Sequence, residues 1–143
     1  MPKRVGEARW DGSLREGQGV LRVASGAYEG PYSFQSRFEE GDGTNPEELI
    51  AGAHAGCFSM NLSGTLGRAG YEPESVETIA TVHLDRDDAG FSITRIELDT
   101  RARVAGIGDD EFQQLAKEAE RTCPVSRALA GVDSIEVHAE LVS

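Results

Sequence analysis

The chain has 143 residues, of which 38% are hydrophobic, and its formal net charge at pH 7 is −11. A chain of this length can bury a sizeable core, so we predict a single domain over residues 1–143. Its acidity argues against nucleic acid and anionic membranes as partners, because neutralising phosphate groups requires clustered Lys and Arg side chains.

The first part of the chain, from Val5 to Phe38, has the pattern of a strand meander. The sequences VLRV at 20–23 and YSFQSRF at 32–38 alternate apolar and polar residues, which is typical of half-buried strands. The Gly-containing pairs at 11–12 and 16–17 and the E-G-P sequence at 29–31 indicate turns. We therefore predict three strands, followed by a loop at 39–44.

Residues 44–66 predict a long helix. Asn45 is a favourable N-cap, Pro46 suits the first helical position, and Glu47 favours the positive end of the helix dipole. No Asp, Glu, Lys or Arg occurs from residue 49 to residue 67, and such a helix is buried or lies in a membrane. It lacks the Leu, Ile and Phe density of a membrane span, so we expect a buried central helix. Small residues recur along it at helical spacing and would let another backbone approach: Gly52, Gly56, Ser59 and Ser63.

The second half of the chain predicts a hairpin, two helices and a last strand. Alternating residues between Val76 and Val104 flank a turn sequence at 86–90. A helix opens at Asp109, and Pro124 then favours a new helix with Cys123 as its N-cap. The apolar stripe of the first of these helices is Phe112, Leu115, Ala116 and Ala119. The second helix closes at residue 131, and a strand at 135–142 completes an α+β fold of order βββ–α–ββ–α–α–β.

The two cysteines differ in their predicted surroundings. Cys57 lies mid-helix among small and apolar residues, where desolvation raises a thiol pKa, and it would be an inert small hydrophobe unless a cation approached it. Cys123 lies at a helix N-terminus beside Arg121, where a thiolate is favoured. The N-terminus MPKRVGEARW has no apolar signal core, so we expect a cytoplasmic protein, in which a structural disulfide is unusual. Besides the inert interpretation, the two cysteines could therefore form a redox pair, in which one thiol attacks a substrate and the other resolves the product.

Two other chemistries compete with a thiol pair. His54 and Cys57 lie one helical turn apart and could ligate zinc together with Cys123. His83 or His138 would have to complete the set, and no C-x-x-C or H-x-x-x-H motif supports it. Serine catalysis has still weaker support, because the serines considered lack a G-x-S-x-G context: Ser59, Ser63 and Ser126.

Three segments in the same order resemble the OsmC/Ohr family of organic hydroperoxide reductases. They are SRFE at 36–39, GTNPEELIAGAHAGCFSM at 43–60 and CPVSRAL at 123–129. The H-A-G-C and C-P-V-S sequences, with the long N-terminal meander, resemble the OsmC branch more than the Ohr branch. The resemblance implies an OsmC-like α+β fold, with antiparallel sheets around a long buried central helix in an intertwined homodimer.

The resemblance also implies residue roles. Cys57 would be the peroxidatic cysteine, whose thiolate attacks a hydroperoxide and becomes a sulfenic acid. Cys123 would resolve that sulfenic acid to a disulfide. Arg37 would lower the pKa of Cys57 and polarise the peroxide, and Glu47 would hold the Arg37 guanidinium in a bidentate pair.

The implied substrates are organic hydroperoxides, with hydrogen peroxide less favoured. An external dithiol, of the lipoyl type in this family, would reduce the disulfide, and no metal, haem or flavin cofactor would be needed. The alternative is an OsmC-like protein that binds ligands or serves in stress without turnover.

One distance complicates these implied roles. Glu47 and Cys57 are ten residues apart (57 − 47 = 10), which is about 15 Å along a straight helix, so one guanidinium cannot easily reach both. Either the helix begins after Glu47, or Arg37 and Glu47 reach the Cys57 of another subunit. The stripe of small residues and the intertwined dimers of the family favour the second alternative.

Overall fold

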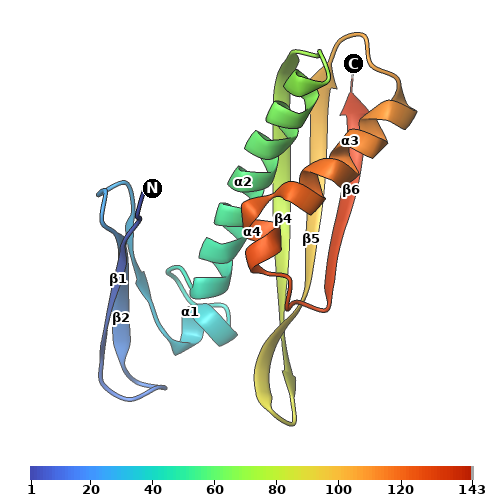
Figure 1. The fold of residues 1–143 in the computed structure, drawn as a ribbon. Helices are drawn as coiled ribbons and strands as arrows, with labels where there is room; N and C mark the ends of the chain where they lie inside the picture. The colour runs from blue at the N-terminus through green and yellow to red at the C-terminus, as the bar shows by residue number, and fades with distance from the viewer. Residues whose placement is uncertain (143) are drawn as a thin grey trace. The chain divides into compact units, whose positions relative to one another are not determined.

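The computed structural model describes residues 1–142. The chain divides into two compact units, Met1–Leu49 and Ile50–Ser143 (Figure 1). The long helix α2 (Pro46–Arg68) begins in the first unit and continues through the second. The single-domain organisation stays a prediction.

The first unit contains an antiparallel sheet with the strand order β1-β2-β3. Its strands are β1 (Gly6–Asp11), β2 (Gln18–Val23) and β3 (Glu29–Tyr32). The predicted turn at 29–31 is wrong, because these residues form most of β3 and the chain reverses at 24–27 instead. A proline is tolerated there because β3 is an edge strand of this sheet, and an edge strand need not donate every backbone N–H.

The predicted strand at 32–38 is also wrong, since only Tyr32 belongs to a strand and α1 (Phe34–Phe38) follows. Ser33 caps this helix, because its Oγ accepts from the Ser36 N–H at 3.1 Å and its N–H donates to the Ser36 Oγ at 2.8 Å. This reciprocal capping box favours a helix start over continued pairing in the sheet. The two Phe residues that mimic strand alternation are also four residues apart, and their ring centroids lie 5.0 Å apart on one helix face.

Helix α2 begins as predicted. The Asn45 Oδ1 accepts from the Glu48 N–H at 2.7 Å, and the Asn45 Nδ2 donates to the Ser36 carbonyl at 2.9 Å. The expectation that the helix is buried on all sides is not met within one chain, because Met60 is 81% exposed and a side chain at Gly56 would meet open space. Only the face with large apolar residues is packed within the chain.

The second unit contains a sheet with the order β4-β5-β6. The predicted hairpin is β4 (Pro73–Asp87) paired antiparallel with β5 (Gly90–Val104). The last strand, β6 (Ser134–Val142), runs parallel to β5, so this sheet is mixed rather than antiparallel throughout. The parallel pairing follows from the crossover through α3 (Asp109–Thr122) and α4 (Pro124–Ala128). This crossover returns the chain from the end of β5 to the opposite end of the sheet, so that β6 runs in the same direction as β5.

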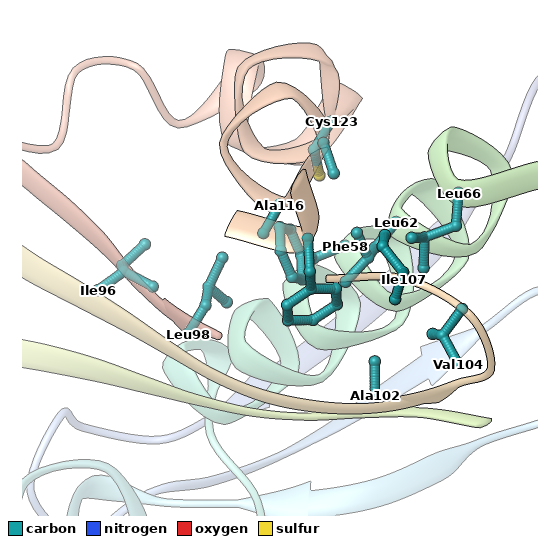
Figure 2. Close-up of a cluster of buried hydrophobic side chains, with 12 residues drawn as sticks. Phe58, Leu62, Leu66, Ile96, Leu98, Ala102, Val104, Ile107, Ala116 and Cys123 are labelled. Carbon is teal, nitrogen blue, oxygen red and sulfur yellow. The ribbon is translucent and has the colours of Figure 1, made fainter. Parts of the chain in front are cut away.

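Helices α2 and α3 cover one face of this sheet (Figure 1). Even-numbered residues of β5 from 96 to 104 are buried, as the alternation of a half-buried strand predicts. Figure 2 shows Phe58 and Leu62 of α2 in one buried cluster with Leu98 of the sheet. The fully buried apolar side chains are Phe58, Leu62, Leu66, Ile96, Leu98, Ala102, Phe112, Ala119 and Cys123. The predicted stripe of α3 and the α+β class are thereby confirmed. Among residues 1–142, no helix is long and apolar enough to cross a membrane.

Candidate active site

The two cysteines lie together in the second unit. The Cys123 thiol donates toward the Cys57 sulfur, with 3.2 Å between the two Sγ atoms, and both are free thiols. Cys123 is fully buried, whereas Cys57 is partly accessible. A small reagent can therefore reach Cys57 more easily than Cys123.

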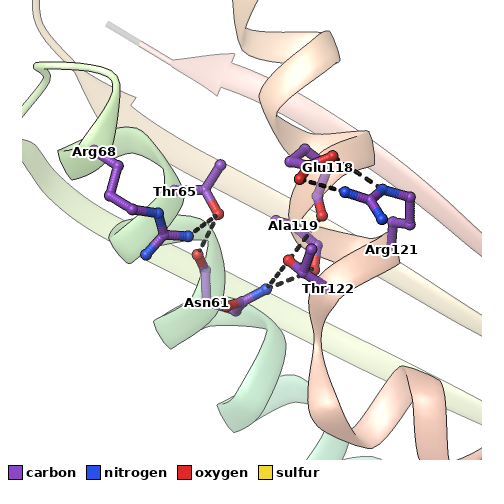
Figure 3. Close-up of polar contacts among 7 residues, drawn as sticks. All are labelled: Asn61, Thr65, Arg68, Glu118, Ala119, Arg121 and Thr122. Atoms are coloured by element: carbon purple, nitrogen blue, oxygen red, sulfur yellow. Dashed lines mark hydrogen bonds and ion pairs between the residues drawn. The ribbon is translucent and has the colours of Figure 1, made fainter.

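The position of Cys123 follows from the proline after it. Pro124 occupies the start of α4, and Cys123 has an extended backbone (φ −61°, ψ 119°) between α3 and α4. Cys123 is the N-cap of α4 as predicted, but its side chain makes no capping hydrogen bond. Its sulfur is thus left to face Cys57. Arg121, which the sequence places beside it, is ion-paired at 2.6 Å with Glu118 on the surface (Figure 3).

The pKa of Cys57 is raised above the ordinary thiol value. Burial is the main cause, and the neighbouring Cys123 thiol contributes in the same direction. A hydrogen bond from the Val125 backbone N–H acts against them and lowers the pKa. Because the net shift is upward, Cys57 in this environment is mainly a protonated thiol at neutral pH, and its activation requires a cation.

Polar contacts flank the cysteine pair on both sides along α2. The Asn61 Nδ2 donates to the Ala119 carbonyl at 2.7 Å and to the Thr122 Oγ1 at 2.9 Å, at the end of α3 (Figure 3). One turn before Cys57, the His54 Nε2 lies 2.6 Å from the Ser126 Oγ on α4.

Sequence reasoning missed the roles of both flanking contacts. His54 was considered as a zinc ligand and as part of the H-A-G-C motif, and Asn61 was not considered. The available signal was the spacing 54, 57 and 61, which places three polar side chains on one face of a helix. The partners of these side chains are at least 58 residues away in sequence, so no local pattern identifies them.

The other two predicted site residues meet in the first unit. The Arg37 Nε donates to the Glu47 Oε1 at 2.9 Å. Glu47 is 8% exposed, and its Oε2 has no hydrogen-bond partner in the structure, so the pair is a single bond rather than the expected bidentate one. Arg37 also lines a cavity of about 210 Å³ whose other walls are Trp10, Leu14, Tyr32, Ser33, Phe34 and Phe38.

The start of α2 excludes one of the two explanations given above for the distance between Glu47 and Cys57. Because the helix begins at Pro46, it includes Glu47, and the alternative in which it begins later is wrong. The structure thus brings together Cys57 with Cys123 and Arg37 with Glu47, each pair within its own unit.

The competing chemistries find little support in the geometry. Within residues 1–142, no group of three or more His, Cys, Asp and Glu side chains is arranged to hold a metal ion. His83 is instead bonded to Glu97 at 2.6 Å. The contact between His54 and Ser126 resembles the histidine–serine contact of a catalytic triad. In a triad, however, an acidic side chain accepts a hydrogen bond from the other ring nitrogen and orients the histidine, whereas the His54 Nδ1 has no hydrogen-bond partner.

Comparison with known proteins identifies the family. Residues 39–138 match the sequence profile of the OsmC family, described as OsmC-like protein. This match includes Glu47, Cys57 and Cys123, whereas Arg37 lies just outside it. The chain is 48% identical over 127 residues to the peroxiredoxin OsmC of Escherichia coli strain K12, a match that covers 88% of this chain and 89% of that one.

More distant relatives agree with this match. An organic hydroperoxide resistance protein of Xanthomonas axonopodis pv. citri is 35% identical over 92 residues, which is 64% of this chain and 63% of that one. The crystal structure of OhrB of Bacillus subtilis has a TM-score of 0.68 at 23% identity, covering 96% of this chain and 98% of that one. An OsmC-like protein from Mycoplasma pneumoniae has a TM-score of 0.77 at 16% identity, with 99% of each chain covered. The predicted fold family is confirmed, and the chain belongs to the OsmC family.

Proposed function

We propose that this protein is a thiol peroxidase that reduces organic hydroperoxides with Cys57 and Cys123. The observation that carries the proposal is the contact between a partly accessible and a fully buried thiol, 3.2 Å apart. The accessibility of Cys57 suits the cysteine that reacts with the peroxide. The burial of Cys123 suits a cysteine that reacts only with its neighbour. The name peroxiredoxin OsmC, given to a relative with 48% identity, supports the same activity.

The first step oxidises Cys57. Its thiolate attacks the terminal oxygen of the hydroperoxide, the O–O bond breaks, and the alkoxide leaves as an alcohol after taking up a proton. Cys57 becomes a sulfenic acid. The Val125 N–H, which already lowers the pKa of Cys57, is placed to stabilise the thiolate before the attack.

The second step joins the two cysteines. The Cys123 sulfur attacks the Cys57 sulfur, an S–S bond forms, the S–O bond breaks, and the oxygen leaves as water with the thiol proton. The sulfurs start 3.2 Å apart and must approach to about 2.05 Å, a movement of about 1 Å. An external dithiol, for which a lipoyl-type thiol is our candidate, then reduces the disulfide by thiol–disulfide exchange.

Arg37 is the proposed source of the positive charge that Cys57 requires, with Glu47 as its support. Ten residues of α-helix separate Glu47 from Cys57 and rise about 15 Å, so the pair would act on the Cys57 of a second copy of the chain. The exposed face of α2, with Gly52, Gly56 and Met60, would lie at the interface of such a homodimer.

A consumption assay tests the activity. Wild type with dithiothreitol or dihydrolipoamide should reduce cumene hydroperoxide faster than hydrogen peroxide. Cys57→Ser should have no activity, and Cys123→Ser should react once and accumulate a sulfenic acid that dimedone traps on Cys57. Ser59→Ala, on the same helix, is the matched control and should keep full activity. If wild type consumes no peroxide, the protein is a binding module instead of an enzyme.

A further inference from the structure

The contact between His54 and Ser126 has no role in the chemistry described so far. His54 is fully buried, Ser126 is 5% exposed, and their side chains meet at 2.6 Å. His54 precedes Cys57 by one turn on α2, and Ser126 follows Cys123 by one turn on α4. The His54–Ser126 bond and the cysteine contact are therefore neighbouring links between the same two helices.

The His54–Ser126 bond leaves one buried polar atom of the imidazole unpaired. The buried His54 Nδ1 has no hydrogen-bond partner in the structure. Leaving a buried polar atom unpaired is unfavourable, whereas apolar side chains of similar shape at both positions can be nearly neutral for stability. The stability of the core alone does not account for a histidine here.

The link holds the element that carries the resolving cysteine. Helix α4 contains only five residues, and Cys123 is its N-cap. Asn61 holds the end of α3 through Ala119 and Thr122, on the other side of the cysteine pair. Without the His54–Ser126 bond, α3 would keep its side-chain link to α2, whereas α4 would be held near Cys57 by the Val125 N–H contact and by apolar packing alone.

We infer that His54 and Ser126 are positioning residues for disulfide formation, and that their bond keeps Cys123 within reach of oxidised Cys57. This inference rests on the proposed function. The Cys57 sulfenic acid has two fates: attack by the Cys123 thiol, which gives the disulfide and water, or oxidation by a second hydroperoxide, which gives a sulfinic acid and an alcohol. The bond favours the first fate and thereby protects the enzyme from over-oxidation.

The test separates the two chemical steps in one turnover. Reduced wild type and His54→Leu/Ser126→Ala are mixed rapidly with one equivalent of cumene hydroperoxide, and peroxide loss and disulfide are measured on quenched samples. Peroxide loss should be unchanged. Disulfide formation should be about tenfold slower in the double variant, with a dimedone adduct on Cys57 and more sulfinic acid at higher peroxide.

Two further variants complete the test. His54→Gln places an amide near the position of Nε2 and should restore most of the disulfide rate. Ser59→Ala removes a different contact of α2, the 2.7 Å bond to Thr78, and should behave as wild type. Ser126→Ala alone removes only one hydroxyl. If the double variant does not fold, the rate of disulfide formation in Ser126→Ala decides whether the His54–Ser126 bond positions Cys123.

The outcomes distinguish this inference from the proposed function. A wild-type disulfide rate in the double variant and in Ser126→Ala would overturn the inference and leave the peroxidase intact. Equal slowing of both steps would also overturn it, because the pair would then act on Cys57 or on the fold. A wild type that forms no disulfide would remove the proposed function itself.

Discussion

At the scale of single residues, the reactivity of Cys57 depends on effects that oppose one another. Burial raises its pKa, which disfavours the thiolate that the proposed chemistry needs. The Val125 N–H acts in the favourable direction but does not offset burial. Arg37, with its guanidinium held at 2.9 Å from Glu47, is the proposed compensation.

The role of Arg37 can be tested through the reaction of Cys57 with iodoacetamide. In Cys123→Ser, where Cys57 is the one thiol left, the pH midpoint of alkylation should move upward when Arg37→Ala is added. The shift should be about 1–2 pH units, the range expected for loss of one nearby opposite charge. Glu47→Gln should give a smaller shift in the same direction. Coincident pH profiles with and without Arg37 would remove it from the mechanism.

Burial of His54 predicts a specific loss of stability in acid. Desolvation lowers its pKa in the folded protein, so the unfolded chain binds its proton first. The stability that a neutral His54 contributes is therefore present above pH about 6.5 and is lost as the pH falls below it. His54→Gln cannot bind this proton, so urea unfolding from pH 8 to pH 5 should show a shallower decline than in wild type. Parallel declines would contradict the assignment.

The site illustrates how far sequence alone reaches at this scale. The residues Arg37, Glu47, Cys57 and Cys123 come from a resemblance over short segments, and the structure brings them together as two pairs. The single rather than bidentate Arg37–Glu47 bond and the link from His54 to Ser126 could not be predicted. Both depend on side-chain directions and on partners that are distant in sequence.

At the scale of elements, the junction between α1 and α2 depends on Asn45. Its side chain accepts the Glu48 N–H and donates to the Ser36 carbonyl, so it joins a cap to a tertiary contact. Asn45→Ala should lower the free energy of unfolding by about 1–2 kcal/mol in urea denaturation. Asn45→Asp keeps the cap but loses the Nδ2 donor, so its free energy of unfolding should lie between those of wild type and Asn45→Ala. An unchanged Asn45→Ala would show that neither bond contributes.

The prediction failed at 32–38 because residues four apart share a face both in a strand and in a helix. Alternation at 32–38 fits a strand, but Phe34 and Phe38 also fit one face of a helix, and the Ser33–Ser36 capping box decides between them. The hairpin and the stripe of α3 were predictable because each has a long pattern of one period. The parallel pairing of β6 is a tertiary property that its alternation does not encode.

At the scale of the whole molecule, the predicted homodimer would cover the face of α2 that one chain leaves open. Met60, 81% exposed, lies on this face. In sedimentation at micromolar concentration, wild type should be a dimer and Met60→Glu should be mainly monomer, because a buried unpaired charge is strongly unfavourable. Ile79→Glu is the matched control, since Ile79 is 71% exposed on β4, and it should stay dimeric. A monomeric wild type would contradict the dimer.

The measurement that tests the central claim most directly is the intact mass of the reduced protein after one equivalent of cumene hydroperoxide. The mechanism predicts the loss of two hydrogens per chain, with peptide mapping that places the disulfide between Cys57 and Cys123, and one alcohol formed per chain. A protein whose mass is unchanged while the peroxide remains intact, or one that gains oxygen on Met60 or Cys123 with both thiols never joined, would contradict it.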